Sequence, residues 1–225
     1  MSENKEQQAE KNLENVEVAL TKTEQFFENN QRPIAIGALA IIVIVALIWI
    51  VNSLYLEPRK ADAQREIFNA QYYFEADSFA LALNGDGVTP GFINVIDEYG
   101  STPAGKLACY YAGVCNLKLG NYDDAKKYFK SFSSDDETLN AFAEGLIGDA
   151  EAQLGNNDAA ISAYKKAAAT KNKIAAPIFL IKLGSMYEVE GDKAKAKEAY
   201  QTVKDEYPMS VQASTADKYI NAVGE

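Results

Sequence analysis

The side chains in this sequence that could do chemistry are carboxylates and two cysteines, because the chain contains no histidine. The lack of imidazole removes the commonest general base, the usual zinc ligand and the partner of a serine or cysteine nucleophile. Cys109 and Cys115 are six residues apart on one predicted helix, about 240° around its axis, so they cannot easily bridge each other. The sequence has no P-loop, dinucleotide-binding glycine motif or nucleophile elbow. We therefore predict that the protein is not an enzyme and has no catalytic residues, metal site or cofactor.

The segment Asn84-Gly85-Asp86-Gly87 contains residue types found in calcium loops. It lacks the ligand spacing of an EF-hand loop and the glutamate that closes one. A glycine-rich turn is the prediction.

The charge balance restricts the kind of partner. Residues 57–225 carry 18 basic and 25 acidic side chains. Nucleic acid and anionic lipid surfaces both favour basic patches, so neither is predicted as the main partner. A protein partner fits this balance better.

Three segments of the sequence are similar to one another, at a period of 35 and then 36 residues. They are GVCNLKLGNYDDAKKYF (residues 113–129), GDAEAQLGNNDAAISAY (residues 148–164) and GSMYEVEGDKAKAKEAY (residues 184–200). Each contains two glycines, an alanine and a final aromatic residue in register. Such a unit is typically one helix pair, which buries its apolar face only against its neighbours.

Each shared position has a physical reason. The first glycine lies within a predicted helix, where it costs about 1 kcal/mol relative to alanine, so it indicates close approach of the paired helix. The second glycine (Gly120, Gly155 and Gly191) can end that helix in the left-handed conformation. Asp123 and Asp158 then place negative charge at the start of the second helix, where the helix dipole favours it.

These residues resemble the tetratricopeptide-repeat family. The resemblance implies an all-α solenoid of about four helix pairs plus a C-terminal capping helix, with a concave surface. The predicted units are a degenerate first repeat at 57–105, repeats at 106–140, 141–176 and 177–210, and a capping helix at 211–225. The first helix of the degenerate unit is predicted from Arg59 to about Leu83.

The concave surface is predicted to be a protein-binding groove lined by the first helix of each pair. Its predicted residues are Leu107, Tyr110, Val114, Leu117, Phe142, Gly145, Asp149, Ala152, Ile178, Ile181, Ser185 and Glu188. Family members that bind acidic C-termini use lysines and asparagines at set positions of this groove, of which only Lys182 is present here. The predicted ligand is therefore an apolar or extended polypeptide. Alternatively, several of these residues pack against the first unit or the cap.

The stretch from Ile34 to Val51 has eighteen residues without a charged side chain. A cleaved signal would have a basic region before it and a cleavage site close behind, and a core helix would have a polar face. Its length and the flanking Trp49 and Tyr55 favour a transmembrane helix, predicted at 33–55. A break at 56–58 is expected to separate it from the repeats.

An amphipathic arm is predicted at residues 1–32, before the span. Its contact face is Leu13, Val16, Leu20 and Phe27. The arm either docks on another membrane protein or a second copy, or is a solvent-exposed helix.

The layout of arm, span and repeats resembles the YfgM-like membrane-anchored proteins of bacteria. Charges flanking the span do not decide its orientation. The resemblance implies a single-pass protein of the bacterial inner membrane, with a cytoplasmic N-terminus and periplasmic repeats. It also implies three kinds of partner: Sec translocon subunits, a membrane-anchored periplasmic prolyl isomerase chaperone and exported polypeptides.

The resulting interpretation is an ancillary Sec translocon subunit that assists exported chains or periplasmic chaperones. The alternatives are a scaffold for cell-envelope or secretion-apparatus assembly and a membrane-tethered cytoplasmic adaptor.

Overall fold

The computed structural model describes residue 26 and residues 29–224. The chain divides after Pro58 into two compact units, which we describe separately. The predicted contact face of the arm, Leu13, Val16, Leu20 and Phe27, lies outside the described residues.

The first unit contains the apolar helix α2 (Gln31–Val51), which has no buried residue. A π-helical turn, η1 (Asn52–Leu56), follows it. The expected break at 56–58 is wrong, because these residues are helical. The proline ring at Pro58 would clash with the carbonyl four residues earlier in a regular α-helix. The π-helical turn just before it, in which the Glu57 N–H donates to the Asn52 carbonyl, widens the backbone there.

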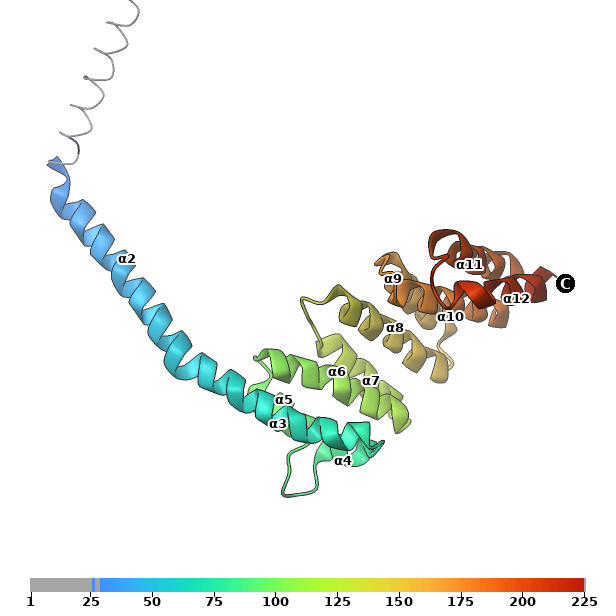
Figure 1. Cartoon of the computed structure of the whole chain (residues 1–225), viewed down its shortest axis with the longest axis horizontal. Coiled ribbons are helices and arrows are strands. Elements are labelled where there is room, and N and C mark those ends of the chain that lie inside the picture. The colour runs from blue at the N-terminus through green and yellow to red at the C-terminus, as the bar shows by residue number, and fades with distance from the viewer. Residues whose placement is uncertain (1–25, 27–28, 225) are drawn as a thin grey trace, which may run out of the picture. The chain divides into compact units, whose positions relative to one another are not determined.

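The second unit is a succession of helices. Their bounds are α3 (Glu57–Glu75), α4 (Phe79–Asn84), α5 (Phe92–Tyr99), α6 (Pro103–Lys118), α7 (Tyr122–Ser131), α8 (Glu137–Gln153), α9 (Asn157–Ala169), α10 (Ala175–Val189), α11 (Lys193–Glu206) and α12 (Ala213–Gly224). The pairs α6–α7, α8–α9 and α10–α11 follow one another from green to red in Figure 1, and α12 packs at the end. The all-α prediction is therefore confirmed.

The degenerate first unit differs from the prediction in one respect. Its first helix does not continue to Leu83, because α3 ends at Glu75 and Asp77 adopts a left-handed φ of 54° before α4 begins. The glycine-rich turn that follows is confirmed, with Gly85 at φ 79° bridged to Pro90. The Asp86 carboxylate accepts hydrogen bonds from the Thr89 and Val88 N–H groups and the Tyr73 hydroxyl, which lower the pKa of Asp86 to about 2.

The repeat glycines act as predicted. A Cβ added at Gly113, Gly148 or Gly184 would lie 2.6, 2.6 or 2.2 Å from the ring of Phe129, Tyr164 or Tyr200. The aromatic residue that ends each repeated segment therefore packs directly on the backbone of the first helix. The second glycines have φ values of 81°, 75° and 76°, so each first helix ends in the left-handed conformation.

The capping helix is also confirmed. Ala216 and Val223 of α12 are buried, and the Tyr219 ring stacks on the Tyr200 ring of α11 at 5.1 Å between centroids. This packing covers the face of the α10–α11 pair that points away from α8 and α9, as a capping helix does.

Ala160→Tyr is expected to lower the free energy of unfolding by about 1–3 kcal/mol, as is typical of added bulk in a packed core. Ala160 is fully buried at the junction of α9 with its neighbours, so a phenol ring has no space there. The control is Ala159→Tyr, because Ala159 is exposed on the same helix and should change stability by no more than about 0.5 kcal/mol. Urea unfolding followed by circular dichroism measures both variants. Equal midpoints for the two would contradict the packing at Ala160.

Candidate protein-binding groove

The predicted groove residues lie on α6, α8 and α10, the first helices of three successive pairs. Those proposed to contact a partner are all half-buried: Leu107, Tyr110, Val114, Leu117, Phe142, Asp149, Ile178 and Ile181. Gly145 is a correction, because it is buried and a Cβ there would lie 2.0 Å from the Phe179 ring of α10. The missing side chain at Gly145 leaves room for the Phe179 ring of the next repeat, so Gly145 does not line a groove.

The α6 part of this surface is apolar. The Tyr110 ring lies 5.3 Å from the Phe132 ring and 5.9 Å from the Phe129 ring, and burial raises the pKa of Tyr110. Val114 and Leu117 pack against the buried cluster that contains Phe129 and Phe132. Part of each side chain is therefore packed on its own helix pair and the next repeat, not on the cap, while another part remains accessible.

A hollow of about 380 Å³ lies beside Leu107, between α6 and the loop from α7 to α8. Leu107, Phe132 and Leu139 supply apolar side chains to its lining, and Lys106 and Asp135 supply charged ones. Sequence reasoning missed Phe132 and Leu139 in this role. The one available signal was an apolar residue at the start of the loop and another in the first turn of α8, and the repeat register relates neither to the groove.

The junction of α8 and α10 is charged. The Lys182 ammonium lies 2.6 Å from both carboxylate oxygens of Asp149, and the Tyr164 hydroxyl donates to the same carboxylate at 2.8 Å. Burial and then the Asp149 charge raise the pKa of Tyr164. Lys182, the one lysine that the sequence analysis found at the groove positions compared with the family, is therefore already paired within the domain.

The α10 end of the surface has a carboxylate of its own. Glu188 is exposed and accepts a hydrogen bond from the Tyr200 hydroxyl, which also contacts the Ser185 hydroxyl at 3.3 Å. Burial and then the bond to Glu188 raise the pKa of Tyr200. This end of the surface is thus polar and acidic, in contrast to the α6 end.

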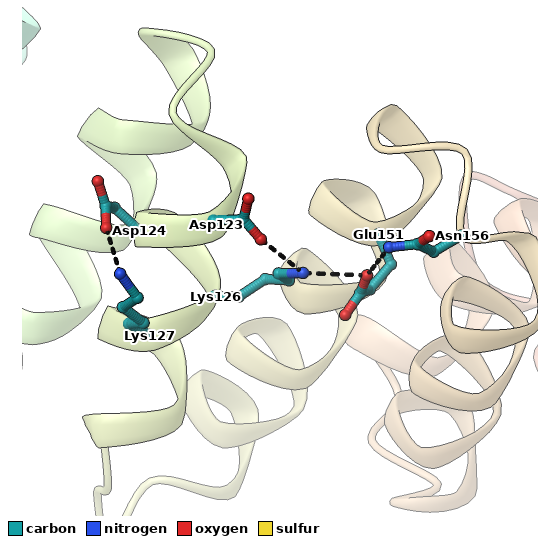
Figure 2. Close-up of polar contacts among 6 residues, drawn as sticks. All are labelled: Asp123, Asp124, Lys126, Lys127, Glu151 and Asn156. Atoms are coloured by element: carbon teal, nitrogen blue, oxygen red, sulfur yellow. Dashed lines mark hydrogen bonds and ion pairs between the residues drawn. The ribbon is translucent and has the colours of Figure 1, made fainter.

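A second ion pair joins the α6–α7 and α8–α9 repeats through their neighbouring helices (Figure 2). The Lys126 ammonium of α7 lies 3.1 Å from the Glu151 carboxylate of α8, and their side chains are only 15% and 13% exposed. The Asn156 amide donates to the same carboxylate at 2.8 Å. Burial opposes ionisation of Glu151 and by itself would raise its pKa. The hydrogen bonds from Asn156 and then from Lys126 favour the ionised form more strongly, so the pKa of Glu151 is lowered from the ordinary value of 4.5.

Glu151→Gln is expected to destabilise the fold near neutral pH and progressively less at acidic pH. A folded-state pKa below the unfolded-state value stabilises the fold above the unfolded-state pKa, and this contribution is lost as the pH falls through the folded-state pKa. Urea midpoints of the variant and the parent protein should therefore converge between about pH 7 and about pH 3. Asp124→Asn is the control, since its pair with Lys127 is exposed to water and should contribute little to stability. A constant difference across the pH range would contradict an ionised Glu151.

Within the described residues, no group of three or more Cys, Asp or Glu side chains comes together in a way that could hold a metal ion. The buried Cys109 and Cys115 thiols are free, and burial raises the pKa of Cys115 to about 12. Neither thiol is therefore poised as a nucleophile.

Comparison with known proteins supports the repeat assignment. Residues 108–136 and residues 139–210 each match a tetratricopeptide-repeat family model. The crystal structure of MamA protein aligns with a TM-score of 0.55 at 20% identity, over 72% of this chain and 86% of that chain. A second MamA structure aligns with a TM-score of 0.42 at 24% identity, over 59% of this chain and 86% of that chain. PcrH from Pseudomonas aeruginosa aligns with a TM-score of 0.46 at 20% identity, over 53% of this chain and 92% of that chain. No curated protein matches the sequence.

The helix pairs, the glycine positions and the two family-model matches define the class of protein. The second unit is a tetratricopeptide-repeat array, a domain type that mediates protein–protein interaction. The chain is a tetratricopeptide-repeat protein with one long apolar helix near its N-terminus.

Proposed function

We propose that this protein is a membrane-anchored interaction protein, an ancillary subunit of the Sec translocon that assists exported chains or their periplasmic chaperones. In this proposal α2 crosses the bacterial inner membrane once, the N-terminus is cytoplasmic and the repeats are periplasmic. The groove binds a polypeptide and performs no reaction.

The main support for a membrane anchor is the surface of α2. It has 21 residues and is apolar on all sides, and none of its side chains is buried. Such a surface is unfavourable in water, and a bilayer would cover it. The helix is about 30 Å long, which matches the hydrocarbon thickness of a membrane.

The main support for polypeptide binding is the half-buried apolar surface of α6 and α8, which consists of Leu107, Tyr110, Val114, Leu117 and Phe142. Groups that are partly packed within the domain are held in place and lose little freedom on binding. The hollow beside Leu107 offers space for an apolar side chain of a ligand. An extended apolar segment, such as occurs in a chain that has not yet folded, fits this surface.

The resemblance to YfgM-like proteins supports the translocon partner and the orientation. That resemblance rests on the layout of arm, span and repeats over nearly the full chain. The partners it suggests are translocon subunits, a membrane-anchored periplasmic prolyl isomerase chaperone and exported polypeptides.

In-cell photocrosslinking tests the proposal. A photoreactive residue is placed at Leu20, at Tyr110 and, as a control outside the groove, at the exposed Phe68, and captured proteins are identified by mass spectrometry. Translocon subunits captured from Leu20, and exported chains or a periplasmic chaperone captured from Tyr110 but not from Phe68, are the expected result. Cytoplasmic proteins captured from Tyr110 would contradict the orientation. Capture of cell-envelope assembly proteins alone would favour a scaffold for that machinery.

A further inference from the structure

The Asp149–Lys182 pair occurs at one junction of the array only. The residues that correspond to Asp149 in the neighbouring repeats are Val114 and Ser185, and those that correspond to Lys182 are Tyr111 and Leu146. Neither neighbouring repeat therefore has a carboxylate or an ammonium at these positions. The pair is a local feature of α8 and α10 and does not follow from the repeat pattern.

Three contacts fix the Asp149 carboxylate, two from Lys182 and one from Tyr164. Lys182 Nζ lies 2.6 Å from each oxygen of Asp149, and the Tyr164 hydroxyl, which reaches the site from α9, donates to Asp149 Oδ1. The Asp149 and Lys182 side chains are 21% and 39% exposed, so water screens the pair less than it would a surface pair. Hydrogen bonds between ionised groups are about twice as strong as those between neutral groups.

A carboxylate that approached Lys182 from the groove would meet two obstacles. It would have to displace Asp149 from the ammonium, and it would then lie beside that carboxylate as a like charge. The polar end of the groove is therefore complementary to a neutral or basic segment and not to an acidic one.

We propose that Asp149 is a specificity-determining residue of the groove. By holding Lys182, it excludes ligands that carry a carboxylate at this point, so the groove takes extended apolar segments without acidic side chains or a free C-terminal carboxylate there. Tyr164 positions Asp149 for this role. The inference rests on the proposed polypeptide binding at the same surface and specifies the chemistry of the polypeptide.

The variant Asp149→Asn removes the negative charge of this side chain and keeps its shape. The asparagine carbonyl still accepts the Tyr164 hydrogen bond, but the negative charge that holds Lys182 is removed. Two fluorescein-labelled probes are compared by anisotropy with the full-length protein in mild detergent. One is a peptide of alternating leucine and threonine that ends in an amide, and the other is the same peptide ending in aspartate with a free carboxylate.

The parent protein should prefer the amide peptide. Asp149→Asn should shift the ratio of the two dissociation constants toward the acidic peptide by about tenfold or more, as expected for a released charge-assisted contact. Lys182→Met, introduced into the Asp149→Asn protein, should abolish the shift. Asp124→Asn, on the exposed surface of α7, makes the same charge change outside the groove and should leave the ratio unchanged.

Two results would overturn the inference. An unchanged ratio in Asp149→Asn, with either peptide still bound by the parent protein, would contradict the role of Asp149 and leave polypeptide binding intact. Failure of both peptides to bind any variant would contradict the groove and, with it, this role of Asp149.

Discussion

Phe179→Ala is expected to lower the free energy of unfolding by about 3–5 kcal/mol, the usual range for truncating a buried phenylalanine. Phe179 is 1% exposed and lies at the contact between two repeats. Its ring stacks on the Tyr164 ring at 6.1 Å and meets the Phe142 ring edge-on at 5.7 Å. Gly145 is its partner on α8, where no Cβ would fit. Removal of the ring leaves a cavity against a glycine, which has no side chain to fill it.

The control for this prediction is Phe68→Ala, the same substitution on α3. Phe68 is 68% exposed, so its loss should change stability by no more than about 0.5 kcal/mol. Urea unfolding of both full-length variants, followed by circular dichroism, provides the comparison. The Phe179 ring would not be the link between repeats if the two variants unfolded at similar urea concentrations.

The double variant Tyr110→Ala, Phe142→Ala is expected to weaken binding of the amide-ended leucine–threonine peptide by about 2 kcal/mol or more, or roughly thirtyfold. Both rings are half-buried on adjacent first helices, and aromatic side chains held in this way often contribute most of the binding energy of an interface. Each ring also contacts a core aromatic, Phe132 for Tyr110 and Phe179 for Phe142. Some loss of thermal stability is therefore expected, and binding should be measured well below the melting temperature.

Tyr72→Ala is the matched control for binding, because Tyr72 is an exposed aromatic residue on α3, outside the predicted groove. It should leave the peptide affinity unchanged. If the double variant bound the peptide as well as the parent protein does, the surface of α6 and α8 would have no part in ligand binding.

The membrane anchor, the partners and the arm are still predictions. The apolar helix is seen where the sequence predicts it, but the arm residues Leu13, Val16, Leu20 and Phe27 lie outside the described structure. The crosslinking experiment addresses the arm directly through Leu20. It also separates the translocon partner from the alternatives.

The repeat architecture could be predicted from the sequence because its signals are local and occur three times. A glycine such as Gly120 ends a helix through its own backbone conformation, and the pairing of Gly148 with Tyr164 occurs within one unit of the repeat. Three copies in register make such a pattern visible without knowledge of the contacts. The helix pairs and their order followed from it. The degenerate first unit has no such support, which is why the end of α3 at Glu75 was missed.

The tertiary structure alone decided the contacts between one repeat and the next. Lys182 and Asp149 are far apart in sequence and occupy different positions of the repeat, so no periodicity relates them. Gly145 occupies a position that the repeat pattern predicts to line the groove, but the Phe179 ring of the following repeat covers it. The hollow beside Leu107 likewise depends on a loop that the register does not describe. The sequence thus determined which helices form and how each pair closes, because those choices depend on residues close together in the chain. The accessible side chains and charges of the groove depend on packing between repeats, which only the folded array establishes.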